Sequence, residues 1–185
     1  PDQFVARAGQ KLQHARSTFK IDVTNKVCAD FGCSTGGFGD CLLQNGVKKV
    51  YAVDTAYGEL AWKLRNNPRV VVMERTNILH MQHLGGEGQV DLITIDAGWT
   101  KLELVLPVVK KFLKPSGIII ALLKPHYETE KRQLVKGVLP ENVADEVKEI
   151  VIQKIYDLGF KIYDQMDSPI LGGSGNKEYL LYLTF

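Results

Sequence analysis

The stretch DFGCSTGGFGD, residues 30–40, decides the fold of this chain. It follows the apolar run 27–29 and precedes Cys41-Leu42-Leu43, so it predicts a strand, a glycine-rich turn and a helix. Glycines let the backbone approach a ligand closely, and the first N–H groups of the helix point into the turn. The stretch therefore predicts a nucleotide-type cofactor site in a doubly wound α/β domain. An ordinary glycine-rich turn is the alternative.

The spacing of the glycines favours one class of cofactor. It is G-x-x-x-G-G-x-G, and Ser34 stands where a dinucleotide fingerprint needs the glycine that admits a pyrophosphate. This disfavours a nicotinamide dehydrogenase and favours S-adenosylmethionine. Asp54 ends the next predicted strand, near the offset of about 20 residues at which an acid binds a ribose in this fold. Asp54 as a simple cap of the strand end is the alternative.

Composition places the chain among ordinary globular proteins. Its 185 residues, 45% hydrophobic and 24% charged, suit one domain covering residues 1–185. No apolar run approaches the about 20 residues of a membrane span, and the first residues do not resemble a signal peptide. The three cysteines lack C-x-x-C spacing, which disfavours disulfides and zinc and fits a reducing cytoplasm.

Charge is spread unevenly along the chain. Residues 101–136 hold eight Lys or Arg against three Glu, whereas residues 141–178 hold eight acids against four Lys. This asymmetry indicates a polyanion facing one side of the molecule. Solvated helix faces would give the same pattern and are the alternative.

Hydrophobic periodicity predicts the remaining elements. The expected helices are 3–19, 37–45, 60–64, 101–113 and 140–158, and the expected strands are 26–31, 47–53, 70–73, 90–95, 118–123, 160–166 and 178–185. The last two strands, joined by a turn, predict an antiparallel pair beside an otherwise parallel sheet. Residues 125–139 are polar and weakly periodic, and predict a mobile loop over the cleft.

Three predicted strands end in polar residues that we expect to meet. Asp54, Asp96 and Lys124 each follow a strand, and parallel strands bring their carboxyl ends to one edge of the sheet. Such a gathering beside a glycine turn predicts a catalytic cleft. His80 and His83 have no third metal ligand nearby in sequence, so a metal site is disfavoured.

Several motifs resemble one known family. They are RAGQKL (7–12), DFGCSTGGFGDCLLQNG (30–46), VYAVDTAYGELAWKLRNNPRV (50–70), ERTNI (74–78), DLITID (91–96), LLKPHYE (122–128) and SPILGGSGNKEY (168–179). In this order they resemble the FtsJ-like RNA methyltransferases, most closely the TlyA branch of ribosomal RNA 2′-O-methyltransferases, whose members are often labelled haemolysins. The resemblance implies a Rossmann-like class I methyltransferase with a mostly parallel seven-stranded sheet and an antiparallel last strand.

The same resemblance implies the site. The family's Lys-Asp-Lys-Glu tetrad falls on Lys11, Asp96, Lys124 and Glu178. The implied contacts of S-adenosylmethionine are Asp30, Gly32, Ser34, Thr35, Gly36, Gly37, Phe38, Asp54, Asn77 and Asp96. Asn77 as a turn residue is the alternative at that position. The implied partner is RNA, in particular ribosomal RNA or a ribosomal subunit, and no metal is required.

Two departures from the TlyA branch are visible. That branch usually carries an S4-type RNA-binding domain ahead of the catalytic one, whereas this chain opens almost at the first catalytic helix. The segment after Asp96 reads Ala-Gly-Trp-Thr, where the branch more often has a Val-Ser-Phe run. Because that segment borders the acceptor, this departure leaves the choice of substrate open.

The chemistry at Lys124 depends on its pKa. Burial and the nearby Lys11 would lower the pKa of this amine, while Asp96 and Glu178 would raise it, so the sequence leaves the sign open. Cytosine-C5 and amino methylation are disfavoured, because no cysteine follows Cys41 and no Asn-Pro-Pro-aromatic run follows Ile95. A noncatalytic module that binds S-adenosylmethionine or RNA stays as an alternative. A pore-forming haemolysin is disfavoured, because no helix looks lipid-seeking.

Overall fold

The computed structural model describes residues 3–185. Its strands are β1 (Val27–Phe31), β2 (Lys49–Val53), β3 (Val70–Met73), β4 (Val90–Ile95), β5 (Leu113–Leu123), β6 (Lys161–Asp167) and β7 (Tyr179–Thr184). Its α-helices are α1 (Ala8–Thr18), α2 (Gly37–Gln44), α3 (Trp62–Arg65), α4 (Leu102–Val109), α5 (Pro125–Glu128) and α6 (Glu141–Asp157).

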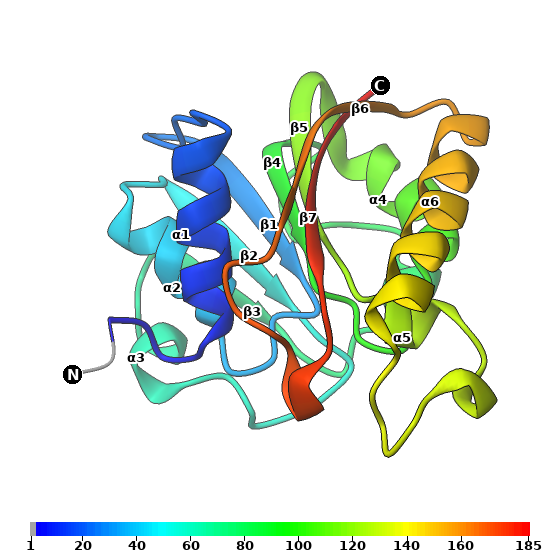
Figure 1. The fold of residues 1–185 in the computed structure, drawn as a ribbon. Coiled ribbons are helices and arrows are strands. Elements are labelled where there is room, and N and C mark those ends of the chain that lie inside the picture. Colours follow the sequence, from blue (N-terminus) through cyan, green and yellow to red (C-terminus); the bar gives the residue numbers. More distant parts are fainter. Residues whose placement is uncertain (1–2) are drawn as a thin grey trace.

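One sheet runs through the molecule in the order β3-β2-β1-β4-β5-β7-β6. The chain moves outward from β1 to β3 and then returns to place β4 on the other side of β1 (Figure 1). Phe31, the last residue of β1, pairs with Val53 of β2 and Ile95 of β4, so these strands end level with one another. The carboxyl ends of β1 and β4 therefore form the switch point at which ligands bind in such sheets.

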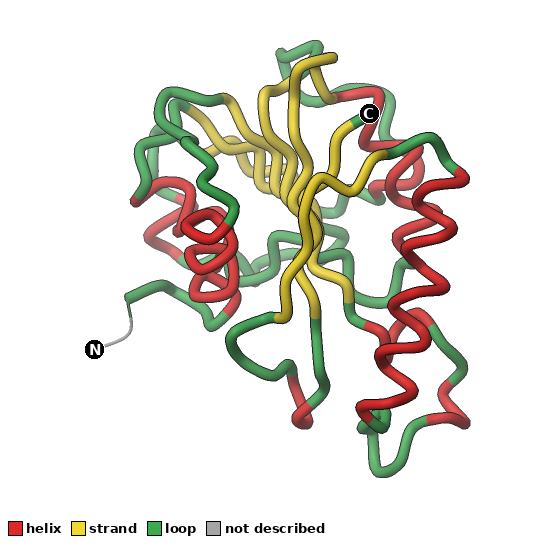
Figure 2. Tube along the Cα trace, turned by 45° about the horizontal axis from the view of Figure 1, so that its top comes forward, coloured by secondary structure: helices red, strands yellow, loops and turns green. Residues whose placement is uncertain are grey.

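Helices cover both faces of the sheet. Figures 1 and 2 show α1, α2 and α3 on one side and α4, α5 and α6 on the other. Successive residues of β1 point to opposite faces, so that Cys28 packs in the core under α1 and α2 and Ala29 in the core under α4 and α6. A strand buried on both sides must be apolar throughout, which explains the continuous run 118–123 in β5.

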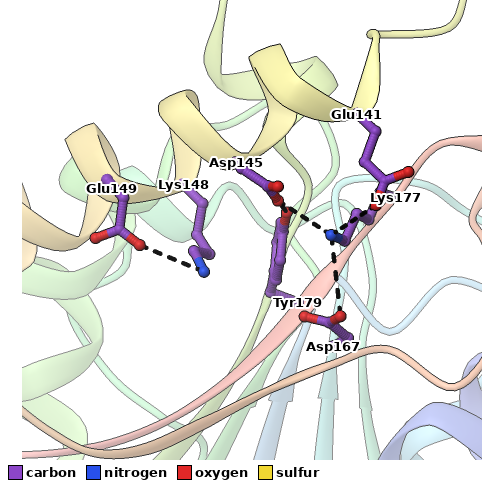
Figure 3. Close-up of polar contacts among 7 residues, drawn as sticks. All are labelled: Glu141, Asp145, Lys148, Glu149, Asp167, Lys177 and Tyr179. Carbon is purple, nitrogen blue, oxygen red and sulfur yellow. Dashed lines mark hydrogen bonds and ion pairs between the residues drawn. The ribbon is translucent and has the colours of Figure 1, made fainter.

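The last strand runs against its neighbours. β7 pairs antiparallel with both β5 and β6, which confirms the expected class I methyltransferase sheet. Figure 3 shows that α6 is tied to this strand by Asp145, which accepts hydrogen bonds from Lys177 Nζ at 3.1 Å and from the Tyr179 hydroxyl. Because β7 is antiparallel, its first residues lie at the same edge as the carboxyl ends of β4 and β5.

The predicted first helix was too long. Residues 3–7 are turns and bends, and α1 begins at Ala8. The N–H of Val5 donates to Asp40 Oδ2 of α2 at 2.9 Å, and the ring of Phe4 lies against Gly9. These contacts fold the segment across α2, and the apolar period of residues 4–8 reflects that packing rather than a helix.

Two further predictions need correction. Leu113 was expected in a helix, but α4 ends at Val109, a short 3₁₀ turn covers Lys110–Phe112, and Leu113 opens β5. Pro115 favours this ending, because the residue before it, Lys114, is driven toward extended backbone. The expected loop 125–139 contains α5, where Pro125 occupies the first helical turn.

Candidate active site

The glycine turn after β1 brings two strand ends into close contact. Gly32 has φ of 79°, and a Cβ at this position would lie 2.0 Å from the carbonyl oxygen of Asp96. The N–H groups of Gly32 and Cys33 both donate to the carbonyl of Val53, at 2.9 and 3.0 Å. The turn is thus locked to the ends of β2 and β4, and only glycine fits at its first position.

Asp54 organises the rim of this turn. Its Oδ2 accepts a hydrogen bond from Ser34 N at 2.7 Å, and its Oδ1 accepts one from Ala56 N at 2.9 Å. The capping interpretation of Asp54 is therefore correct as a description of these contacts. A carboxylate has about four lone-pair sites, so two are left for a ligand.

A cavity of about 380 Å³ opens at the switch point. Its lining residues are Gly32, Ser34, Asp54, Thr55, Glu59, Asn77, Ile78, Asp96, Ala97, Gly98, Trp99, Thr100 and Lys124. A smaller hollow shares Gly32, Ser34 and Asp96 with it and adds Asp30, Thr35, Gly36, Gly37 and Phe38. The structure thus brings all ten predicted cofactor residues to two adjoining hollows, the larger of which has the size of a small-molecule site.

Some of these residues also have structural contacts. Phe38 of α2 lines the smaller hollow, but it is 2% exposed and also packs in the hydrophobic core on that face of the sheet. The side chain of Asn77 accepts a hydrogen bond from Leu79 N at 3.0 Å, which is the turn role considered for it. Whether either contacts a cofactor stays a prediction.

Asp30 is the unusual member of the smaller hollow. It is 1% exposed, and its Oδ1 accepts a hydrogen bond from the hydroxyl of Thr94 at 2.9 Å. Its Oδ2 is buried and finds no hydrogen-bonding partner within residues 3–185. Burial, with the charges of Asp96 and Asp54, raises the pKa of Asp30 to about 7. A cationic ligand group in this hollow would satisfy the unpartnered oxygen and lower that pKa.

Lys124 and Asp96 form an ion pair in the wall of the larger cavity. Lys124 Nζ lies 2.5 Å from Asp96 Oδ1, and both side chains are 19% exposed. Burial works to lower the pKa of Lys124, but the charge of Asp96 and its hydrogen bond outweigh burial and raise the pKa above its ordinary value. Glu178 adds to this effect. The direction of the Lys124 pKa shift, which the sequence left open, is therefore upward, and Lys124 is a cation.

Lys11 and Glu178 form a second ion pair beside the first. Lys11 Nζ donates to Glu178 Oε1 at 2.5 Å, with side-chain exposures of 9% and 2%. Neither residue lines the two hollows. His126 lies within electrostatic reach of both pairs. Burial and the charges of Lys124 and Lys11 lower the pKa of its imidazole to about 4. The four predicted catalytic residues thus meet as two neighbouring pairs, although their roles stay predictions.

Sequence reasoning assigned no site role to several lining residues. Thr55 and Glu59 border the cavity and lie within the 50–70 motif, and Thr100 lies in the segment after Asp96, but the motifs assigned no role to them. Trp99 was noticed only as a departure in sequence, yet it is 64% exposed at the cavity and its ring centroid lies 4.1 Å from that of Tyr127. A tryptophan three residues after the predicted catalytic aspartate was the available signal.

A comparison with protein families identifies the chain. The model described as FtsJ-like methyltransferase matches residues 4–185. The chain belongs to the FtsJ-like methyltransferase family. The resemblance seen in the motifs is thereby confirmed.

Relatives of this FtsJ-like chain carry two kinds of name. The Mycobacterium tuberculosis protein named 16S/23S rRNA (cytidine-2′-O)-methyltransferase TlyA is 38% identical over 97% of this chain and 68% of its own length. YqxC of Bacillus subtilis, provisionally named as an rRNA methyltransferase, is 42% identical over 99% of this chain and 66% of its own. A solved structure from Streptococcus thermophilus, provisionally described as a hemolysin, has a TM-score of 0.93 and 38% identity, covering 99% of this chain and 67% of that one. The FtsJ-like chain spans about two thirds of the length of these relatives.

Two kinds of feature are absent from the part of the FtsJ-like chain that the structure describes. Within residues 3–185, no helix has both the length and the apolar character needed to cross a membrane. Over the same residues, no group of three or more His, Cys, Asp or Glu is arranged to hold a metal ion.

Replacing Asp54 tests the cofactor side of the site. Asp54→Ala is expected to weaken binding of S-adenosylhomocysteine by roughly 1–3 kcal/mol, because buried ligand hydroxyls lose their acceptor. Isothermal calorimetry measures the change. Asp22→Ala is the matched control, since Asp22 accepts a hydrogen bond from the N–H two residues later at 2.9 Å, as Asp54 does, but on an exposed turn away from the cavity. Equal affinities for the two variants would contradict the assignment.

Proposed function

We propose that the chain is an S-adenosylmethionine-dependent methyltransferase that modifies ribose 2′-hydroxyls of ribosomal RNA. The observation that carries the proposal is the Lys124–Asp96 ion pair in the wall of the cavity that the glycine turn and Asp54 border. Membership of the FtsJ-like family supports it. The printed name of the TlyA relative, an rRNA cytidine-2′-O-methyltransferase, supports the choice of acceptor.

The residues at the switch point fit S-adenosylmethionine. Asp54 has free acceptor sites for the two ribose hydroxyls, and Gly32 and Ser34 line the cavity beside it. The buried, unpartnered Oδ2 of Asp30 suits the cationic amino-acid end of the cofactor. When bound, this cofactor supplies an electrophilic methyl group on a sulfonium.

The tetrad would act on the hydroxyl that receives the methyl group. Asp96 holds Lys124 Nζ at 2.5 Å and so fixes the direction from which the amine meets the hydroxyl. A cation brought into the cavity lowers the pKa of Lys124, because like charges disfavour the charged amine. In its neutral form, Lys124 Nζ would accept the proton that the hydroxyl oxygen loses as that oxygen takes the methyl group. Alignment of these atoms supplies much of the rate.

The rim of the cavity suits an unpaired nucleotide. The exposed ring of Trp99 lies against Tyr127, and Lys131 Nζ is 4.9 Å from the centre of the Trp99 ring. Aromatic rings interleaved with cations are the usual contacts of single-stranded RNA, where bases stack and phosphates pair with Lys and Arg. Arg132 adds a second exposed cation next to Lys131. This arrangement supports RNA as the acceptor.

Transfer of a labelled methyl group tests the proposal directly. We expect label from S-adenosylmethionine to enter ribosomal RNA, supplied naked and as each ribosomal subunit, and to make the modified linkage resistant to alkali because the 2′-hydroxyl is blocked. Transfer to a base, or to protein only, would refute ribose methylation. Transfer RNA is the comparison substrate.

Reversing two charges on the rim tests the RNA contact. Lys131→Glu with Arg132→Glu is expected to weaken RNA binding at least about tenfold and to flatten its dependence on salt, because fewer counterions are released. Filter binding at several salt concentrations measures both. The matched control is Lys26→Glu with Lys48→Glu, which makes the same charge change at the amino ends of β1 and β2, where Lys48 N donates to Lys26 O at 2.8 Å. Equal losses in both variants would place the RNA elsewhere.

A further inference from the structure

The carboxylate of Glu178 rests against a glycine. A Cβ built on Gly172 would lie 1.9 Å from Glu178 Oε2 and 2.5 Å from its Cδ. Gly172 has φ of −75° and ψ of −175°, an extended conformation open to any residue. Backbone geometry therefore does not require glycine here, and the space taken by the Glu178 carboxylate does.

The loop around Gly172 is held in place. Gly172 N donates to the carbonyl of Asn176 at 2.7 Å, and the carbonyl of Gly172 accepts from Gly175 N at 3.0 Å. One residue earlier, Arg7 Nη2 donates to the carbonyl of Leu171 at 2.8 Å. The loop cannot retreat from an added methyl group without breaking hydrogen bonds.

The main chain of Glu178 is also fixed on both sides. Its neighbours Lys177 and Tyr179 are both held by Asp145 of α6 (Figure 3), and its carbonyl accepts from Ser168 N at 2.9 Å. The side chain of Glu178 is therefore the part that would have to shift. A methyl group on Gly172 would push the carboxylate away from Lys11.

We infer that Gly172 is a positioning residue for Glu178, and that its missing side chain is what allows the Glu178 carboxylate to reach Lys11 Nζ. The part of this inference that concerns catalysis rests on the proposed function. The part that concerns the ion pair stands on the contacts alone. Glu178 in turn lies within electrostatic reach of Lys124, so its displacement alters the charge around the reacting amine.

Single-turnover rates at saturating RNA and cofactor test the catalytic part. Gly172→Ala is expected to slow methyl transfer by about 100-fold, the scale of a misplaced catalytic group, with unchanged binding of S-adenosylhomocysteine. Gly173→Ala is the matched control, because a Cβ there meets no atom within 4 Å and its φ is not in the left-handed region, so its rate is expected to match the parent. In a Glu178→Asp background, where the acid is one methylene shorter, Gly172→Ala is expected to cost little further rate. Equal rates for the two alanine variants, or losses that multiply in the Asp background, would overturn the inference.

Thermal unfolding tests the ion-pair part without reference to activity. Gly172→Ala is expected to lower the unfolding midpoint by about 5 °C, because the Lys11–Glu178 pair is disturbed. In a Glu178→Ala background the same change is expected to raise the midpoint slightly, because alanine reduces the freedom of the unfolded chain at a compatible backbone position. A fall of equal size in both backgrounds would overturn the inference. If the parent protein transfers no methyl group to RNA, the proposed function fails while this reversal of sign still decides the role of Gly172.

Discussion

Replacing Lys124 by alanine is expected to slow methyl transfer by roughly 10²–10⁴-fold, which is what general acid–base help is typically worth. Cofactor affinity should persist, because Asp54 and the glycine turn are untouched. Lys124→Arg is expected to be as slow, because arginine cannot release its proton at working pH and its planar fork has a different shape. Single-turnover rates at saturating RNA measure these effects.

Lys114→Ala is the matched control for Lys124→Ala. Lys114 pairs with Asp91 at 2.9 Å on the same two strands, β5 and β4, but toward their other ends. If Lys124 only held a phosphate, Lys124→Arg would work well and Lys124→Ala would lose RNA affinity with normal chemistry once RNA is saturating. That outcome would refute the proton-accepting role.

The dependence of the rate on pH is a second test of the proton-accepting role of Lys124. The charges around Lys124 raise its pKa, so the neutral amine that accepts a proton becomes more abundant as pH rises. We therefore expect the single-turnover rate of the parent to climb about tenfold per unit between about pH 6 and 9, without a plateau. The Lys124→Ala variant should lose this slope. A flat profile for the parent would mean that Lys124 acts as a fixed charge.

Removing one member of the Lys11–Glu178 pair is expected to destabilise the fold strongly. Glu178→Ala leaves Lys11 buried without its partner, and uncompensated buried charges cost about 3–5 kcal/mol. Replacing both residues by methionine should restore most of the stability, because well-packed apolar side chains substitute for buried ion pairs. The double variant should nonetheless stay slow in methyl transfer.

Denaturant unfolding measures these stabilities. Glu141→Ala is the control, because Glu141 makes an exposed ion pair with Lys177 at 3.2 Å, and such pairs are worth about 0–1 kcal/mol. If the double methionine variant transferred methyl groups normally, the pair would be purely structural and the tetrad would shrink to Lys124 and Asp96.

The parallel part of the fold could be predicted because its signals are local. The composition and spacing of the glycine turn and of the apolar run in β5 are enough to predict the local backbone conformation. The segment 3–7 was predicted wrongly because its contacts with Asp40 and Gly9 are tertiary, and periodicity alone cannot separate a packed turn from a helix.

Some residues of the candidate site could be predicted from the chain itself, and others could not. Asp54, Asp96 and Lys124 followed from the rule that strand ends meet at one edge. Lys11 and Glu178 lie 167 positions apart, and no pattern within a helix or strand brings them together. Only the family resemblance pointed to them. Gly172 belongs to the SPILGGSGNKEY motif, but the sequence does not show why a glycine is needed there. The structure shows that a side chain would collide with the carboxylate of Glu178.

The distance in sequence between Lys11 and Glu178 also sets when their ion pair can form. Lys11 lies on α1, and Glu178 immediately precedes β7, which lies between β5 and β6 in the sheet. A nascent chain emerges from the ribosome with its amino end first, so the earlier strands can pair before Glu178 is available to Lys11. Under the proposed function, the Lys11–Glu178 pair of the tetrad therefore forms only after β7 has emerged and docked against β5.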